Sequence, residues 1–539
     1  MSRAERSATT ASSTGLSRRQ LLAVTGLGTA AAAVVSPTTP AARADDPTVR
    51  VTDFGADPTG GSHAAAAFQA AIDSLPQGGT VIVPPGTYLL AGEQQVELRS
   101  NVTIEGYGAT IVRRAVKEGH YAAFIGLSRG RKGRGSGVTG VTMRGLTFRG
   151  DFPSGATICI MALHHCADFL IEDCEFIECQ GGAGHTFDLG GCNDITFRGC
   201  TWRGYNARGY GQHDLDNTIE TIQLDISHAS TMSYPDDDGS YDALGTTDVT
   251  IEDCSFLPLD LNGKHYPCPN PIGEHFVQEG QPYRGIVIRD VEILDPPSEP
   301  RTEVKGDNEP AVVGDNANAR GVIHIRQAVD VLIENVTVTA TIPGTTNRVL
   351  MLSSMSWGRL DTPPEIPGSR DFYTDPIPCR NIRVRDLTID GFEAADGEDP
   401  QLNPLIHVNG VDDAAAQDVS IHARIASNAQ TAVRIAKADG ITLKLDIEGP
   451  PVGVDLSECT DVSIHAGSFT DVDLPVRLTG IRAFRINGTD GTHRIRQIAA
   501  VRADATTQDG RIAGTRWSGF DRVLDGGDPS IVLRGNEAT

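Results

Sequence analysis

The chain repeats one short pattern along most of its length, and this repeat constrains the fold more than any other feature. Each copy has alternating apolar residues, a polar pair of Glu or Arg followed by Asp, Asn or Gly, and a second short apolar stretch. Full copies begin at Val141, Phe169, Ile195, Val249, Ile286, Val331 and Ile382, and shorter ones at Val419, Ile441, Val462 and Phe484. Period-two alternation indicates a strand with one buried face, and the polar pair indicates a turn.

Such a unit, repeated about ten times, cannot bury its apolar face alone, whereas stacked copies can. We therefore predict an all-β fold, a single-stranded right-handed parallel β-helix of about ten coils. The spacing between copies is irregular, roughly twenty to fifty residues, which is expected when coils share a core but carry loops of different length.

The cysteines support an apolar interior. Cys174, Cys200 and Cys254 fall at a position that later copies fill with Val291, Val336 and Leu387. Cys166, Cys192, Cys379 and Cys459 share a second position, three residues before the strand. We predict that these thiols are buried and reduced, acting as small hydrophobic side chains, because the closely spaced pairs typical of metal sites are absent.

Composition limits the partners. The 539 residues carry a formal net charge of −24, and 39% of them are apolar. The negative charge argues against nucleic acid or an anionic membrane surface as a partner, because phosphates would be repelled. The apolar content is sufficient for a large core. The oligomeric state cannot be read from the sequence.

Residues 1–44 have the features of an export signal. Ser17-Arg18-Arg19-Gln20-Leu21-Leu22 is a twin-arginine motif, an Ala-rich apolar stretch follows it, and Ala42-Arg43-Ala44 is a cleavage site. The apolar stretch is too short and too weakly hydrophobic to span a membrane well. We predict a signal peptide over 1–44, a β-helix domain over 45–539, and an extracellular protein.

The start of the mature chain resembles a known family. Val51-Thr52-Asp53-Phe54-Gly55-Ala56-Asp57 precedes a helical stretch from His63 to Leu75, and Gly78 to Tyr88 contains Pro-Pro-Gly-Thr-Tyr. This resembles the opening of pectate-lyase-superfamily and polygalacturonase-like proteins. The resemblance implies that residues 45–90 form an N-terminal cap and first coil. It implies no single reaction, because the superfamily includes hydrolases, lyases, epimerases and phage tailspikes.

The register between copies brings polar residues together. A second strand precedes each repeat, with its last apolar residue six positions before the next strand, as in Leu189 and Ile195. With Leu189, Leu224 and Ile325 pointing inward, alternation places two outward columns on successive coils. One column is predicted to hold Asp188, Gln223, His275 and His324, and the other His164, Asp225 and Arg326. His185 and Glu220 lie at the starts of the same strands.

This stripe is the candidate site, because a simply solvated face would carry Thr, Ser, Lys and Glu instead. Long loops at 203–218, 227–245 and 257–272 flank it and could wall a groove. Asp188 and Asp225 should be roughly 8 Å apart between Cα atoms. That offset suits two carboxylates of an inverting glycosidase, one donating a proton and one activating water.

The remaining residues receive supporting roles. Strict parity would point Glu220 inward, but at a corner it could replace either aspartate or orient His185. His275 is the next catalytic candidate after Glu220. Sugar hydroxyls would be bound by the remaining polar residues of the stripe: His185, Gln223, His324, Arg326 and His164.

The resemblance to polygalacturonases does not extend to their active site. Gly273-Glu274-His275-Phe276 is only a partial match to their Gly-His-Gly motif, and Arg320-Gly321-Val322 does not match Arg-Ile-Lys. Asp236-Asp237-Asp238 falls in a loop outside the register. No catalytic residue is therefore transferred from that family.

Three functions remain open. The first is a secreted glycoside hydrolase that cleaves an extracellular polysaccharide without a cofactor. The second is a polysaccharide lyase or uronate epimerase, in which His275 or His324 would act as the base and Arg326 would neutralise a substrate carboxylate. In that case Asp236–Asp238 could bind Ca²⁺. The third is a non-catalytic carbohydrate-binding surface protein, although Trp202, Trp357 and Trp517 form no evident stacking stripe.

Overall fold

The structure is a computed structural model. It describes residues 47–114, 122–151, 159–179, 185–205, 220–227, 241–274, 280–298, 321–354, 376–394 and 404–539. The predicted signal peptide and the acidic run at 236–238 lie outside these residues. Within them, no helix is long and apolar enough to cross a membrane.

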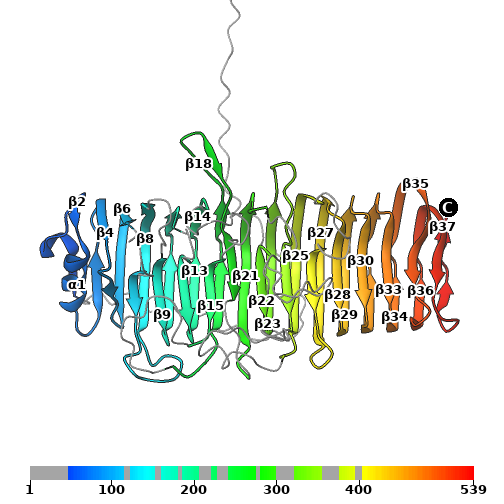
Figure 1. Cartoon of the computed structure of the whole chain (residues 1–539), viewed down its shortest axis with the longest axis horizontal. Helices are drawn as coiled ribbons and strands as arrows, with labels where there is room; N and C mark the ends of the chain where they lie inside the picture. The colour runs from blue at the N-terminus through cyan, green and yellow to red at the C-terminus, as the bar shows by residue number, and fades with distance from the viewer. Residues whose placement is uncertain are drawn as a thin grey trace, which may run out of the picture. The chain divides into compact units, whose positions relative to one another are not determined.

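Each coil contributes a short strand to one face of the solenoid, here called face 1 (Figure 1). These strands pair in parallel with the corresponding strands of the coils before and after. Face 1 consists of β5 (Val96–Glu97), β7 (Ala122–Gly126), β9 (Cys159–His164), β12 (Phe187–Gly190), β15 (Glu220–Asp225), β20 (Asn270–Glu274), β22 (Ile323–Arg326), β24 (Leu350–Ser353), β26 (Pro404–Asn409), β28 (Thr431–Ala436), β30 (Val452–Ser457) and β33 (Leu474–Thr479).

The strand that follows in each coil forms face 2. Its members are β3 (Gly79–Ile82), β6 (Val102–Arg114), β8 (Thr139–Asp151), β10 (Ala167–Glu172), β13 (Asn193–Arg198), β16 (Thr247–Glu252), β21 (Tyr283–Leu294), β23 (Ala328–Thr339), β25 (Arg380–Glu393), β27 (Ala416–Asn428), β29 (Ala438–Glu448), β31 (Thr460–His465), β34 (Arg482–Asn487), β36 (Gln508–Ala513) and β38 (Val532–Arg534). The longer members continue through a bend into the third side of the coil, which also contains β4 (Gly86–Ala91), β11 (Glu175–Ile177), β14 (Thr201–Arg203), β17 (Ser255–Leu257), β32 (Ser468–Thr470) and β39 (Glu537–Ala538). Two long strands, β35 (Asp490–Ala503) and β37 (Arg516–Gly526), begin on this third side and end on face 1, where Val501 pairs with Val476 and Leu524.

The parallel β-helix predicted from the repeat is confirmed, but the solenoid is longer than about ten coils. Fifteen face 2 strands, from β3 to β38, pair in parallel in chain order. The coils that contain β6, β36 and β38 were missed because their sequences depart from the repeat. An example is Gly510, which stands in the column of inward Phe484.

The polar pair of the repeat is a turn, as predicted, and its second residue explains the composition. Asp173, Asp253 and Asn335 have φ values of 51°, 53° and 53°, in the left-handed region. Asp, Asn and Gly reach this conformation at lower cost than other residues. The repeat therefore uses these three residue types where each strand bends into the next.

The core is built from columns of like residues. Phe148, Phe176, Trp202 and Phe256 stack on successive coils, with ring centroids 4.6–5.2 Å apart. All ten cysteines are free and buried, as predicted for both cysteine columns. Burial raises the pKa of the Cys200 thiol well above its ordinary value, and hydrogen bonds with Cys174 and Cys254 raise it further. These thiols are therefore unreactive packing groups.

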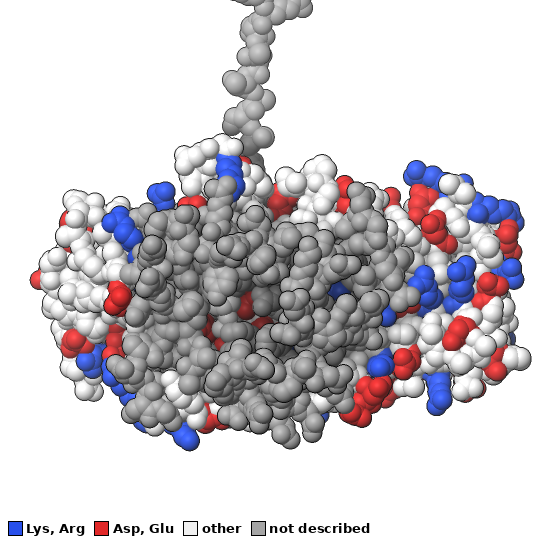
Figure 2. Space-filling view, viewed as in Figure 1, with Lys and Arg blue, Asp and Glu red and all other residues white. Residues whose placement is uncertain are grey.

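A helix closes the N-terminal end, where an open solenoid would expose its core. After β1 (Thr48–Arg50), the 3-10 helix η2 (Val51–Phe54) and β2 (Thr59–His63), helix α1 spans Ala65–Asp73. It buries Phe68 edge-on against Tyr88 and Phe124. The predicted helical stretch is thus confirmed with narrower bounds. Acidic and basic side chains are interspersed over both ends of the solenoid (Figure 2).

Candidate functional site

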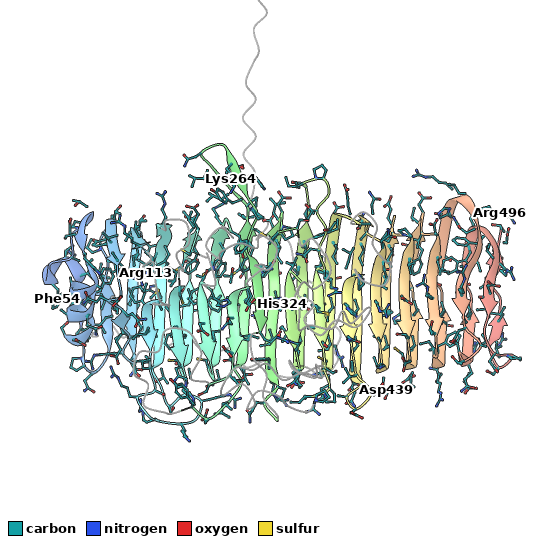
Figure 3. All side chains as sticks on the ribbon, in the orientation of Figure 1. Phe54, Arg113, Lys264, His324, Asp439 and Arg496 are labelled. Atoms are coloured by element: carbon teal, nitrogen blue, oxygen red, sulfur yellow. The ribbon has the colours of Figure 1, made fainter. Side chains whose placement is uncertain are left out.

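The predicted face 1 register is largely confirmed. Asp188 in β12 pairs with Gln223 in β15, and Gln223 pairs with Gly273 in β20. Ile272 pairs with Ile323, which places His324 of β22 next in the same outward column. His324 lies midway along the solenoid (Figure 3).

One position in this column was assigned wrongly. Gly273, and not His275, opposes Gln223. The inward side chain of Ile272 pairs with Ile222 on one side and Ile323 on the other, and this apolar contact fixes the register of β20 two residues away from the predicted one. His275 itself lies outside the described residues.

Asp188, Gln223 and Asp225 form one hydrogen-bonded unit. The Nε2 atom of Gln223 donates to Oδ1 of Asp188 at 3.2 Å and to Oδ2 of Asp225 at 3.0 Å. The backbone N–H of Ile226 donates to the other oxygen of Asp225 at 2.7 Å. The two carboxylates on neighbouring coils therefore converge on a single neutral donor.

All the described candidate residues are buried, although they point away from the core. Asp188, Asp225 and His164 are 0% exposed, and Arg326 has the largest exposure of the set at 9%. A simply solvated face is therefore excluded for these positions. Burial of charged groups is costly unless they are hydrogen-bonded or paired, so their partners define the chemistry available.

Glu220 lies between two histidines. Its Oε2 atom is 3.5 Å from Nε2 of His324, and its Oε1 atom is 3.7 Å from Nδ1 of His185. The Nδ1–H of His185 also donates to the backbone carbonyl of Glu220 at 2.9 Å. Glu220 begins β15, where the alternation starts, and its carboxylate lies beside these two imidazoles in spite of its inward parity.

Arg326 has a partner that the sequence interpretation did not foresee. Glu274 accepts from the backbone N–H of Arg326 at 3.0 Å and from its Nε atom. By register Glu274 opposes the inward residue Leu224, so parity alone would have placed it in the core. The ion pair balances the charge of Arg326, which makes this side chain a structural cation more than a free sugar-binding group.

Tyr283 is a further buried residue beside the site that the sequence interpretation missed. Burial raises its pKa well above the ordinary value, and the neighbouring charges of Asp225, Glu274 and Glu220 raise it further, against the opposing effect of Arg326. Tyr283 begins β21 and falls at the second cysteine position, the one that Cys192 and Cys379 occupy in other coils. The register follows from the next residue, Arg284, which pairs with Thr247. Burial and the charges of these three carboxylates therefore both favour the neutral phenol.

A second polar cluster adjoins Asp225. The Oγ atom of Ser227 lies 2.7 Å from Nε2 of His164 and 2.6 Å from Nε2 of His165. The coil between the histidines and Ser227 contains Gly190, which pairs with both His164 and Asp225. Because Gly190 and Gly191 have no side chains, the imidazoles can reach across that coil. His164 is thus a hydrogen-bonding member of a buried cluster.

The cluster continues beyond the strand ends. His165 lies 3.1 Å from Oδ1 of Asp242 and donates from Nδ1 to the carbonyl of Gly133 at 2.7 Å. The backbone N–H of Gly133 in turn donates to Asp242 at 2.8 Å. These residues lie outside the strands, where period-two alternation does not apply, so the sequence pattern gave no signal for them.

The flanking features contribute less. Most of the loops at 203–218 and 227–245 lies outside the described residues, whereas the third loop forms a hairpin of β18 (Leu259–Leu261) and β19 (Lys264–Tyr266), visible in Figure 1. A hollow of about 720 Å³ lies against α1, lined partly by the ion pairs Arg99–Asp73 and Arg129–Glu97. It contains none of the candidate residues. Among the described residues, no cluster of three or more His, Cys, Asp or Glu side chains has metal-binding geometry.

Comparison with known proteins agrees with the architecture. Residues 48–117 match the family model described as rhamnogalacturonase A/epimerase, pectate lyase-like. No curated protein sequence matches the chain. Among solved structures, the pneumococcal surface adhesin PfbA from Streptococcus pneumoniae is 15% identical with a TM-score of 0.53, over 88% of this chain and 91% of the adhesin.

Two enzymes are also similar at low identity. The A-module of the mannuronan C-5 epimerase AlgE6 from Azotobacter vinelandii is 15% identical, with a TM-score of 0.42 over 91% of this chain and 99% of the module. The family 28 exopolygalacturonase of Yersinia enterocolitica is 10% identical, with a TM-score of 0.35 over 92% and 78%. These likenesses concern the fold alone. The predicted resemblance is thus confirmed: residues 48–117 match a pectate-lyase-like family model, and the described chain has the parallel β-helix fold.

Proposed function

We propose that this protein is a carbohydrate-active enzyme, a glycoside hydrolase that cleaves an extracellular polysaccharide with Asp225 and Asp188 as its acid/base pair. The observation that carries the proposal is the shared donor, because Gln223 holds carboxylates from two coils on one amide nitrogen. The nearest oxygens of the two carboxylates are consequently within about 6 Å of each other, comparable to the roughly 5–9.5 Å that separates catalytic carboxyl groups in glycosidases.

The charge balance of this unit suits acid/base chemistry. The proposed reaction needs one carboxyl group protonated and the other ionised, and a shared buried position suits that division because two like charges at one site repel each other. The protonated group can donate to the leaving glycosidic oxygen, and the ionised group can activate water. Gln223 fixes both groups, because its amide hydrogens point at their oxygens.

The ion pair of Arg326 disfavours the lyase or epimerase alternative. Such a reaction needs a cation that neutralises the carboxylate of the substrate. Arg326 was the candidate cation, but Glu274 already balances its charge. The non-catalytic alternative is disfavoured by burial of acidic side chains, since a binding face gains little from two buried carboxylates on one donor.

A polysaccharide panel tests the proposal. Purified protein is incubated with neutral and acidic polysaccharides, and both new reducing ends and ultraviolet absorbance are measured. Hydrolysis yields reducing ends without new absorbance. Appearance of an unsaturated, absorbing product would establish a lyase instead, and binding without either product would establish a carbohydrate-binding protein.

Export is part of the same proposal. Replacing Arg18 and Arg19 with Lys should retain the protein in the cell, because the export receptor recognises the arginine pair. The mature protein in the culture medium should begin near Asp45. Unchanged secretion of the double variant would indicate the general secretory route.

A further inference from the structure

His324 reaches across an entire coil. Neighbouring coils are about 4.8 Å apart, so an outward side chain ordinarily stacks on the adjacent coil. Gly273 occupies that adjacent position, and Glu220 belongs to the coil beyond it. A Cβ atom at Gly273 would lie 2.2 Å from Nε2 and 2.3 Å from Cε1 of His324. The imidazole therefore fills the space that a side chain at position 273 would occupy.

A glycine is needed at position 273 because it has no side chain, and not because of its backbone conformation. Its φ lies outside the left-handed region that favours glycine. The three heavy atoms that a Cβ atom at this position would approach most closely all belong to His324. Other coils place Asp188, Gln223 or Met351 in the same column. Position 273 is thus an opening in an otherwise filled column.

The contacts of His324 leave its Nε2 atom facing Glu220. Its Nδ1 atom lies 3.0 Å from the carbonyl of Gly321, which can only accept, so Nδ1 carries a hydrogen. Its Nε2 atom faces Oε2 of Glu220 at 3.5 Å. Without a further proton, a lone pair would face a carboxylate. Catalytic contacts are often long in the unliganded state and tighten when substrate binds.

Other charged groups surround this pair and define its setting. His185, two residues before β12, approaches the second carboxylate oxygen of Glu220, and its Nδ1–H donates to a backbone carbonyl. The Arg326–Glu274 ion pair joins β22 to β20. The charge of Glu220 also contributes to the raised pKa of Tyr283. A proton placed between Glu220 and His324 would therefore change the charge close to the strand that carries Gln223 and Asp225.

We propose that Glu220 and His324 form a proton-holding pair that serves the two-aspartate unit on β15, and that Gly273 is its positioning residue. The inference rests on the proposed hydrolase function. The step is a proton transfer between Nε2 of His324 and Oε2 of Glu220, in which one N–H bond breaks as one O–H bond forms. The pair supplies or stores this proton while Asp188 and Asp225 exchange theirs with substrate and water.

A double-mutant cycle tests the positioning role without any substrate. Gly273→Ala should lower Tm when His324 is present, because the new methyl group overlaps the imidazole. In the His324→Ala background the same change should leave Tm unchanged or raise it, since alanine restricts the unfolded chain more than glycine does. Equal losses of Tm in both backgrounds would contradict the claim that Gly273 makes room for His324, whatever the function of the protein.

Kinetics test the proton-holding role. Gly273→Ala, His324→Ala and the double variant should each lower kcat by about a hundredfold, with a similar change in the pH–rate profile and little change in KM. Glu220→Gln should alter the same limb of that profile. Wild-type pH–rate profiles in the single variants would overturn the proton-holding pair. Loss of activity in Asp225→Asn with normal activity in Gly273→Ala would reject this inference while leaving the proposed hydrolase intact.

Discussion

Face 1 carries two stretches of the same outward column that are built on opposite principles. In β12 and β15 the column holds Asp188 and Gln223, with Asp225 beside them. In β28, β30 and β33 it holds Arg434, Asp455 and Arg477. The backbone geometry is the same in both stretches, because parallel strands stack in register. The difference lies in what each carboxylate faces.

In the C-terminal stretch the charges alternate from coil to coil. Asp455 lies 3.4 Å from Nη1 of Arg434 and 3.6 Å from Nη1 of Arg477. In the central stretch the carboxylates of Asp188 and Asp225 share a neutral amide. Alternating charges stabilise a solenoid, whereas two carboxyl groups on one neutral donor are typical of a functional site that costs some stability. Under the proposed function, the central coils would be the reactive part of the column.

The largest expected effect is on turnover. Asp225→Asn should lower kcat on the true substrate by about 10²–10⁴-fold, because an amide cannot transfer the proton. The fold should be retained, since the two side chains have nearly the same shape. Initial rates and a melting curve measured on the same preparation check both statements.

The matched control is Asp455→Asn, in the same column but several coils away. It should leave kcat and KM unchanged, since its partners are Arg434 and Arg477 and no candidate residue. Full activity in Asp225→Asn would make Glu220 and His275 the next pair to test. Equal loss of activity in both variants would show that the central and C-terminal stretches of the column do not differ in function, and would contradict the comparison.

The next effect concerns the shared donor. Gln223→Met keeps the size of the side chain and resembles Met351, which occupies this column naturally. It removes two hydrogen bonds to carboxylates, each worth about 1.5–3 kcal/mol. Both stability and kcat should therefore fall, unlike in Asp225→Asn, where only kcat falls.

Denaturant unfolding and initial rates measure this effect. Arg477→Met, which removes a half-buried cation from the C-terminal stretch, is the control and should cost about 0–1 kcal/mol with normal turnover. A stable, fully active Gln223→Met would show that the amide does not organise the two aspartates.

How much of this could be predicted depends on where period-two alternation holds. Within strands it holds strictly, so Asp188, Gln223 and His324 were assigned to one column from sequence. The prediction was wrong for the coil between them, because the chain lacks a clear repeat near β20 and Ile272 sets the register. Side chains at strand ends, Glu220 and Glu274, depart from parity because the backbone turns there.

The buried partners were less predictable still. His165, Ser227 and Asp242 lie in turns, and their contacts depend on glycines that let side chains cross a coil. Such contacts join residues that are two coils apart, for which a sequence repeat gives no signal. His165 has a φ of 55°, in the left-handed region, and this conformation could not be predicted from its residue type.

A small effect is expected in the core. Cys200→Val should cost less than about 1.5 kcal/mol, because volume-conserving apolar substitutions are tolerated and later coils carry valine at this position. Titration of the denatured wild type should find reduced thiols. A markedly unstable valine variant, or ten oxidised cysteines, would contradict the apolar ladder.

The smallest effect lies in the C-terminal coils and depends on pH. Asp504 is only slightly buried, and although that burial alone would raise its pKa, donors from Thr506, Gly480 and Thr507 outweigh it and lower the pKa from 3.8 to about 2. A carboxylate with a lowered pKa in the folded state stabilises the protein above its unfolded pKa, and this contribution is lost as the pH falls through the folded value. Asp504→Asn should therefore lower Tm slightly at pH 7, with the difference from wild type shrinking between about pH 4 and pH 2. Melting curves across this range measure it, and turnover should be unaffected. A difference that grows as the pH falls would mean that the hydrogen bonds to Asp504 do not stabilise its carboxylate. The C-terminal coils could then no longer serve as a reference in which every carboxylate has stabilising partners.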